Sequence, residues 1–197
     1  MEKLDISPAT WDNAAALAAE RIDIAIQKGI EHPCADDREQ LLCDLREGFN
    51  AFKTMMFGTD EWEFGQKHRH VTVEFLIAFA IIVLTLVPHY DMVLSSKMTK
   101  AEDVLPLLRK KQEDYGYHNI SAFGIDGVLV RMHDKIARIE NLTDKQVEGL
   151  NEPLTDSFYD LIGYCIIGIM LALGIWELPM APHPQVAPHP QDSPEES

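Results

Sequence analysis

Apolar residues recur at steps of three and four positions through almost the whole chain. This spacing is typical of amphipathic α-helices. It predicts helices over about 10–28, 37–56, 70–87, 100–114, 122–142 and 153–176. Pro88 is expected to end the third of them. No run of alternating apolar and polar residues is long enough to indicate a strand, so the chain is predicted to be all-α, a single bundle-like domain of about six helices.

The composition is that of a chain with a hydrophobic core. Of the 197 residues, 46% are hydrophobic and 25% are charged, which is typical of globular domains. From Pro182 onward the sequence is Pro-rich and acidic, and such a segment buries too little apolar surface to fold. We therefore divide the chain into a helical N-terminal part at 1–95, a second helical region at 96–180 and a disordered tail at 181–197.

Two apolar segments are the places where a membrane span has to be considered. Segment 75–87 has 13 residues, and segment 161–176 has 16 uncharged residues. Both are shorter than the usual span of roughly 17–25 residues, and the second has no basic anchor on either side. We expect two buried core helices without membrane association, and the first is compatible with a helix-packed homodimer.

Targeting and cysteine signals indicate a cytoplasmic protein. The N-terminal sequence lacks a basic stretch followed by an apolar one, so no signal peptide is expected. Cys34, Cys43 and Cys165 form no CxxC pair. Their pattern favours a reducing compartment and argues against a structural zinc site.

Charge is distributed unevenly along the chain. The formal net charge is -15, so non-specific binding of DNA or RNA is not expected. Residues 97–145 hold nine of the 17 basic and eight of the 32 acidic residues, a balance of +1, whereas the remainder carries -16. The region best suited to an anion is therefore 97–145, and it favours a small phosphorylated ligand over a polymer.

The predicted helix 122–142 carries a polar face beside its apolar one. Arg131, Asp134, Lys135 and Arg138 fall within one arc of about 100°. Arginine and lysine in this arrangement suit phosphate. A solvated face with pairs of opposite charge along the helix explains the pattern equally, and both interpretations stay open.

Acidic residues step by four along the last predicted helix, at Glu152, Asp156 and Asp160. The first two are also explained by the preference of carboxylates for a helix start. Asp160 borders the uncharged stretch, where an isolated carboxylate is costly. Either these carboxylates, with Asp134, hold a Mg²⁺ ion that bridges phosphate oxygens, or Asp160 pairs with the basic face of helix 122–142.

The segment that precedes helix 122–142 offers groups for a nucleoside. Tyr115 can stack on a base and Asn119 can bond to its edge, with Lys110 and Lys111 just before them. The alternative is an ordinary turn with core aromatic residues. Neither a P-loop nor a dinucleotide-binding GxGxxG motif occurs.

Taken together, these clusters resemble the nucleotide modification associated domain 1 family, a small helical domain seen largely in bacteriophages and prophages. The resemblance covers about residues 100–170 and rests on Lys110-Lys111-x-x-Asp114-Tyr115-Gly116, Asn119, Phe123-Gly124, Gly127, Arg131-x-x-Asp134-Lys135-x-x-Arg138, Asn141-Leu142 and Glu152-x-x-x-Asp156-x-x-x-Asp160-Leu161-x-x-Tyr164. It implies a role in nucleotide or DNA-base modification, without a defined reaction.

Two weaker resemblances concern hydrolases. An acidic helix beside a basic one is similar to the all-α nucleotide pyrophosphohydrolases of the MazG type, which hold Mg²⁺ with ExxE and ExxD helices. No ExxE motif occurs here, and its absence weakens the inference of hydrolysis more than the inference of nucleotide binding. His133-Asp134 resembles the doublet of HD-type phosphohydrolases, but Asp134 belongs to the series above, so we favour a lone histidine.

We therefore expect a cytoplasmic nucleotide-binding protein of phage nucleotide metabolism. As an enzyme it would use Asp156 and Asp160, with Glu152 and Asp134, to hold Mg²⁺ while water attacks a phosphoanhydride. The alternatives are a non-catalytic phage protein that sequesters a nucleotide or binds a host protein, and a structural protein of the phage particle. The expected substrate-binding residues are Lys110, Lys111, Tyr115, Asn119, Arg131, Lys135 and Arg138.

Overall fold

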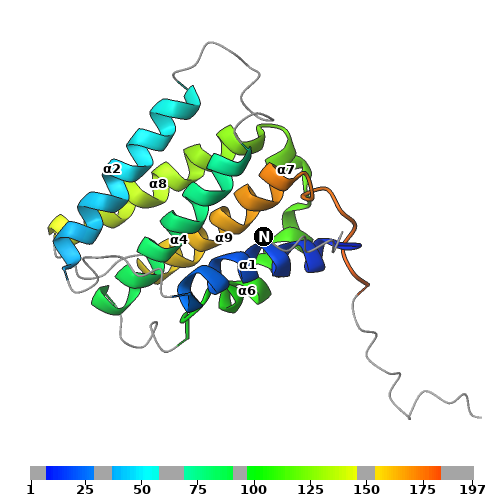
Figure 1. The fold of residues 1–197 in the computed structure, drawn as a ribbon, viewed down its shortest axis with the longest axis horizontal. Coiled ribbons are helices and arrows are strands. Elements are labelled where there is room, and N and C mark those ends of the chain that lie inside the picture. The colour runs from blue at the N-terminus through cyan, green and yellow to red at the C-terminus, as the bar shows by residue number, and fades with distance from the viewer. Residues whose placement is uncertain (1–7, 29–36, 58–68, 91–96, 146–153, 183–197) are drawn as a thin grey trace, which may run out of the picture.

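The computed structural model describes residues 8–28, 37–57, 69–90, 97–145 and 154–182, and these residues form helices and turns without a β-strand. The all-α prediction is thereby confirmed (Figure 1). The elements, in chain order, are α1 (Trp11–Gln27), α2 (Arg38–Phe57), α4 (Arg69–Tyr90), the 3₁₀ helix η1 (Ala101–Val104), α6 (Leu105–Tyr115), α7 (His118–Ser121), α8 (Gly124–Lys145) and α9 (Leu154–Leu173).

Helix α9 is the centre of the packing. It contacts α4 and α8 most extensively, and also α1 and η1. Gly168 allows the close approach of α4, because a Cβ atom there would stand 2.7 Å from Leu76 Cδ1. Helix α2 packs on α4 and α8, while α1 packs on α9 and α4. The core is continuous, and its largest fully buried side chains include Trp11, Phe49, Phe79 and Phe158.

Helix boundaries differ from the predictions by more than one residue at several places, and α8 spans Gly124–Lys145 instead of 122–142. Helix α4 continues past Pro88 to Tyr90, because a proline so near the end removes only one backbone hydrogen bond. The predicted helix 100–114 begins as the 3₁₀ turn η1. Helix α9 ends at Leu173 instead of 176, where Gly174 takes the left-handed conformation (φ 73°) and the Ile175 N–H donates to the Met170 carbonyl at 2.9 Å.

Helices α4 and α9 are long and apolar enough to cross a bilayer by length and composition alone. The expectation that segment 75–87 is too short for a span is therefore not supported, since the helix around it has 22 residues. The most apolar 18-residue window of α4 is 56% buried inside the protein, and that of α9 is 61% buried. Core helices of globular proteins have the same character.

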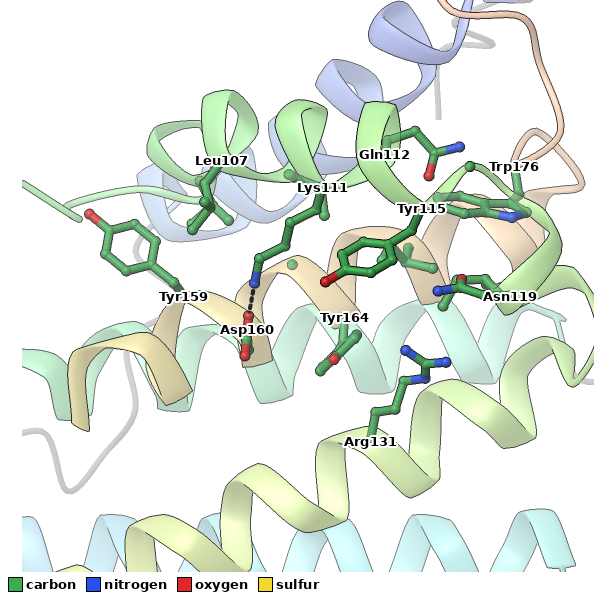
Figure 2. Close-up of a pocket in the computed structure, with 16 residues that line it drawn as sticks. Leu107, Lys111, Gln112, Tyr115, Asn119, Arg131, Tyr159, Asp160, Tyr164 and Trp176 are labelled. Atoms are coloured by element: carbon green, nitrogen blue, oxygen red, sulfur yellow. Dashed lines mark hydrogen bonds and ion pairs between the residues drawn. The ribbon is translucent and has the colours of Figure 1, made fainter. Parts of the chain in front are cut away.

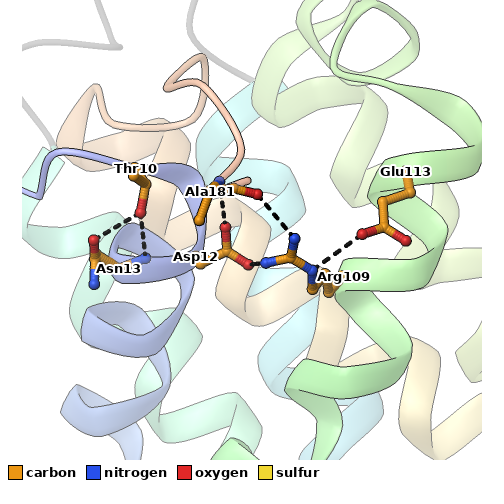
Figure 3. Close-up of polar contacts among 6 residues, drawn as sticks. All are labelled: Thr10, Asp12, Asn13, Arg109, Glu113 and Ala181. Atoms are coloured by element: carbon orange, nitrogen blue, oxygen red, sulfur yellow. Dashed lines mark hydrogen bonds and ion pairs between the residues drawn. The ribbon is translucent and has the colours of Figure 1, made fainter. Parts of the chain in front are cut away.

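Residues after α9 run back across α1 and α6, and we call residues 174–182 the C-terminal strap. The backbone N–H of Trp11 donates to the Pro179 carbonyl at 2.8 Å. The Trp11 and Trp176 rings pack edge to face. Arg109 donates to Asp12 and, at 3.0 Å, to the Ala181 carbonyl (Figure 3). Ala181, the first residue of the predicted tail, is thus tied to α1 and α6, and residues 183–197 of that tail lie outside the described residues.

A buried carboxylate joins α1 to the start of η1. Asp23 on α1 accepts hydrogen bonds from the backbone N–H groups of Ala101 at 2.7 Å and Glu102 at 3.2 Å. These N–H groups have no partner within a helix, so Asp23 supplies the acceptors that they lack. The contact fixes the start of η1 and, through it, the position of α6.

Candidate anion-binding site

A cavity of about 320 Å³ lies between α6, α7, α8 and α9 (Figure 2). Its size is at the lower end of the range of small-molecule sites, ~300–1,000 Å³. The lining comprises Val104, Leu107, Leu108, Lys111, Gln112, Tyr115, Gly116, Asn119, Ile120, Arg131, Tyr159, Asp160, Gly163, Tyr164, Ile167 and Trp176.

Two glycines shape this cavity. Gly163 of α9 faces α6, and a Cβ atom there would stand 3.4 Å from Leu108 Cδ1, so the glycine keeps the α6–α9 contact close. Gly116 follows α6 with a φ of 64°, a conformation that favours glycine. The chain then turns into α7, and this turn brings Asn119 to the cavity wall.

Asp160 lies between two lysines from different helices. Lys135 of α8 pairs with its Oδ2 atom at 2.7 Å, and Lys111 of α6 donates to its Oδ1 atom. The Asp160 side chain is only 12% exposed, against 25% for Lys135 and 42% for Lys111. Of the two explanations for Asp160, pairing with the basic face of α8 is therefore seen, and Lys111 adds a partner from α6.

The electrostatics of Lys135 follow from this arrangement. Partial burial lowers the pKa of the Lys135 ammonium group, but its hydrogen bond to Asp160 and the negative charge of that carboxylate outweigh burial. The pKa of Lys135 is therefore raised above its ordinary value. Lys135 stays protonated at every physiological pH and presents a permanent positive charge beside the cavity.

Arg131 projects from α8 into the cavity, with its guanidinium group toward Asn119 (Figure 2). Within the part of the chain that the structure describes, no side-chain hydrogen bond or ion pair holds it. It stands one helical turn from Lys135, a rise of about 6 Å along α8. The guanidinium fork is thus available to a ligand.

The cavity has a positive charge balance in a strongly acidic protein. The described lining holds Lys111, Arg131 and Asp160, a balance of +1, and Lys135, which pairs with Asp160 from outside the lining, brings the local balance to +2. The whole chain carries -15. An anionic ligand would therefore be attracted here and repelled by much of the remaining surface.

Aromatic and amide side chains form the other end of the cavity. Tyr115 is 69% exposed at the end of α6, where a planar group can stack on it. The Trp176 ring is buried and donates to the Tyr117 carbonyl at 3.4 Å. Asn119 and the buried Gln112 each offer an amide donor and an acceptor.

Sequence-predicted residues fall into two groups. Lys111, Tyr115, Asn119, Arg131 and Asp160 line the cavity, whereas Lys135 is outside the lining and pairs with Asp160. The others lie apart from the lining: Arg138 donates to the Ser157 hydroxyl at 2.7 Å, Lys110, Asp134 and Asp156 are exposed, and Glu152 lies outside the described residues.

The described residues do not by themselves fit a Mg²⁺ site. No group of three or more His, Cys, Asp or Glu side chains comes close enough within them to hold a metal ion. Both oxygens of Asp160 are already bound by lysines, and Asp156 is exposed one turn away. A Mg²⁺ site would need Glu152 and a rearrangement of these ion pairs, so it stays a prediction.

The HD doublet has an ordinary environment. His133 is exposed and stacks on Phe49 of α2, with ring centroids 6.1 Å apart. It lies outside the cavity lining. This position agrees with the lone histidine that we favoured.

Several lining residues were missed by sequence reasoning. Leu108 and Gln112 were missed, although they share one face of α6 with the predicted Tyr115 through steps of three and four. Gly163 and Ile167 were missed in the same way beside the predicted Asp160 on α9. A comparison of these two faces would have found most of the cavity from the sequence. Trp176 had no such signal, because its position depends on the chain reversal at Gly174.

Fold and site together define an all-α protein with a small, positively charged, aromatic cavity. A family model described as nucleotide modification associated domain 1 matches residues 111–171, from α6 to α9. The resemblance predicted from the sequence is confirmed, and the matched segment contributes most of the cavity. No curated protein and no solved structure matches the chain.

Proposed function

We propose that this protein binds a nucleotide in the cavity between α6 and α9. The observation that carries the proposal is the positive charge balance of an aromatic cavity, +1 in its lining and +2 with Lys135, in a protein of charge -15. Arg131, Lys111 and Lys135 would bind phosphate oxygens, since guanidinium and ammonium groups are the usual phosphate ligands. Tyr115 and Asn119 would hold the base or sugar.

The description of the family supports a setting in nucleotide modification. We extend it to the modification of phage nucleotides or DNA bases in the bacterial cytoplasm, as the resemblance implies. Mg²⁺-dependent hydrolysis of the bound nucleotide is the stronger form of the proposal, with Asp156, Asp160 and Glu152 as metal ligands. Sequestration without a reaction needs only the cavity residues.

A thermal-shift screen of ribo- and deoxynucleotides tests the binding. A ligand that binds the folded state raises the melting temperature by mass action, whether or not it is converted. The matched variants are Arg131→Gln, in the cavity, and Lys110→Gln, which removes the same charge from an exposed site on α6. We expect the shift to be lost in the first variant and kept in the second.

Two outcomes would contradict the proposal. If no nucleotide raises the melting temperature, the cavity does not bind one. If Lys110→Gln weakens binding as much as Arg131→Gln, the effect is one of overall charge and not of this site. Chromatography of the nucleotides after incubation with Mg²⁺ then separates hydrolysis from sequestration, because only hydrolysis yields a product.

A further inference from the structure

We propose that Gln112 is a specificity-determining residue that hydrogen-bonds the edge of the nucleobase in this cavity. The inference rests on the proposed function and deepens it, because it states which end of the cavity holds the base. Three observations carry it: a buried amide without a side-chain partner, the access of that amide to the cavity, and the aromatic rings beside it.

Gln112 is a buried polar residue of α6, with only 8% of its surface exposed. Its backbone carbonyl accepts from the Gly116 N–H at 2.8 Å. Within the part of the chain that the structure describes, its side-chain amide forms no hydrogen bond. A buried amide that lacks a partner costs free energy, and an apolar side chain at this position would avoid that cost. The position thus holds a donor and an acceptor for which the described part of the fold has no use.

The amide of Gln112 faces open space. Among the described residues, the buried side-chain atoms that lack both a partner and accessible surface are Trp11 Nε1, Ser121 Oγ and Glu140 Oε1. The amide of Gln112 also lacks a partner but is not among them, so its oxygen and nitrogen both retain accessible surface. The cavity is the open space that Gln112 lines. A ligand there can therefore reach the amide.

The two ends of the cavity offer a base different groups. Figure 2 shows Gln112, Asn119 and Trp176 at one end. The Lys111–Asp160 pair lies at the other end, where both oxygens of Asp160 are already bound by lysines. The amides of Gln112 and Asn119 each offer a donor and an acceptor. A base finds neutral hydrogen-bonding groups at the first end and a completed ion pair at the second.

Aromatic rings beside the amides favour a planar ligand. The Trp176 indole N–H donates to the Tyr117 carbonyl at 3.4 Å, so Trp176 offers the cavity only its ring. Tyr115 adds a second, exposed ring between the two ends (Figure 2). A flat base stacks on such rings, and glutamine and asparagine amides bond to a donor and an acceptor that lie side by side on a base edge. A sugar phosphate without a base offers neither feature.

The test compares the wild type with Gln112→Met, whose side chain has a similar length but no amide. Full-length protein is titrated calorimetrically with the 5′-mono- and triphosphates of the four ribonucleosides and the four deoxynucleosides. The nucleotide that the wild type binds best should bind roughly tenfold or more weakly to Gln112→Met, the effect of losing one or two hydrogen bonds. The differences in affinity among the bases should become smaller at the same time.

Two further measurements separate base recognition from a structural role. Without ligand, Gln112→Met should melt at the same temperature as the wild type or higher, because methionine removes an unpaired buried amide and fills the space flexibly. Gln27→Met is the matched control, since Gln27 is exposed at the end of α1 and lies outside the cavity lining. It should bind every nucleotide as the wild type does.

Other outcomes overturn the inference in distinguishable ways. If Gln112→Met binds every nucleotide as tightly as the wild type, Gln112 does not contact the base and nucleotide binding stays intact. Equal weakening of all nucleotides, with or without a lower melting temperature, assigns Gln112 a structural role and also overturns the inference. If the wild type binds no nucleotide, or binds ribose 5-phosphate as tightly as any nucleotide, the proposed function fails and the inference fails with it.

Discussion

Lys135 Nζ lies 2.7 Å from Asp160 Oδ2, and this ion pair joins α8 to α9 at the edge of the cavity. Lys111 binds the other carboxylate oxygen, so that one acid connects three helices. The carboxylate therefore positions two lysines for a ligand and at the same time competes with that ligand for their charge. These two roles have opposite consequences when Asp160 is replaced.

Replacement of Asp160 by asparagine is expected to destabilise the fold and to strengthen anion binding. The Asp160 side chain is only 12% exposed, and the variant loses its ion pairs with Lys111 and Lys135. We expect this loss to lower the free energy of unfolding by about 1–2 kcal/mol. The local charge, with Lys135 included, rises from +2 to +3, so a phosphorylated ligand should bind several-fold more tightly. Urea denaturation and calorimetry measure the two effects.

Asp156→Asn is the matched control, because Asp156 is an exposed acid one turn away on the same helix. It should change stability by less than about 1 kcal/mol, the usual contribution of a carboxylate near a helix start. If Asp160→Asn weakens nucleotide binding instead, Asp160 contacts the ligand or its metal, as the sequence analysis expected of a catalytic residue.

Removal of divalent metal distinguishes the two views of this site. Binding through Lys111, Arg131 and Lys135 is electrostatic and needs no metal ion, so nucleotide affinity should be unchanged in excess EDTA. It should instead fall as salt is raised, because counter-ions screen exposed charges. Loss of binding in EDTA, with recovery on addition of Mg²⁺, would favour the carboxylate site that was predicted around Glu152, Asp156 and Asp160.

The sequence predicts the helices well, because each amphipathic repeat is a local pattern. The start of α1 at Trp11 and of α2 at Arg38 lie within a residue of the prediction. The acidic stripe and the basic face were also local, and their contact through Lys135 and Asp160 was one of the alternatives left open. Identification of both groups needed only helical spacing.

Tertiary features were harder to predict. The wall that α6 contributes depends on Asp23, 78 positions before Ala101, and no periodicity reports such a contact. The C-terminal strap was missed because 174–176 were assigned to the last helix and the residues from 181 onward to a proline-rich tail, whereas Arg109 and Asp12 supply partners for the Ala181 backbone. In both cases a side chain distant in sequence satisfies backbone groups, which composition does not reveal.

Asp23 is expected to make stability depend on pH. Burial raises the pKa of its carboxyl group, and the N–H groups of Ala101 and Glu102 lower it only in part. A raised pKa means that the folded state binds this proton more tightly than the unfolded chain does. The resulting stabilisation is present below the unfolded pKa, about 4 for aspartate, and is lost as pH rises through the folded pKa.

Urea denaturation at a series of pH values measures this effect as the difference in unfolding free energy between the wild type and Asp23→Asn. The difference should fall from about pH 4 upward and then level off, because asparagine keeps an acceptor but does not titrate. Asp23→Ala removes both hydrogen bonds and should be about 1 kcal/mol less stable than Asp23→Asn at every pH, because neither of these side chains titrates. A difference that increases with pH would mean that the two N–H groups outweigh burial.

Arg109 is expected to hold the C-terminal strap against α1 and α6. It donates to Asp12, to Glu113 at 3.1 Å and to the Ala181 carbonyl, and its side chain is 26% exposed (Figure 3). Arg109→Gln should lower the free energy of unfolding by about 1–3 kcal/mol, since hydrogen bonds to charged groups contribute about that much. The exposed neighbour Lys110→Gln should change it by less than about 0.5 kcal/mol.

Tryptophan fluorescence reports whether the C-terminal strap detaches from α1. Trp176 lies in the strap and packs edge to face on Trp11, with ring centroids 6.0 Å apart. If the strap detaches before the bundle unfolds, tryptophan emission in Arg109→Gln should shift to longer wavelength at lower urea than the loss of helical circular dichroism. Coincident transitions at the wild-type midpoint would show that Arg109 contributes little and that the Trp11–Trp176 contact and the Pro179 hydrogen bond suffice.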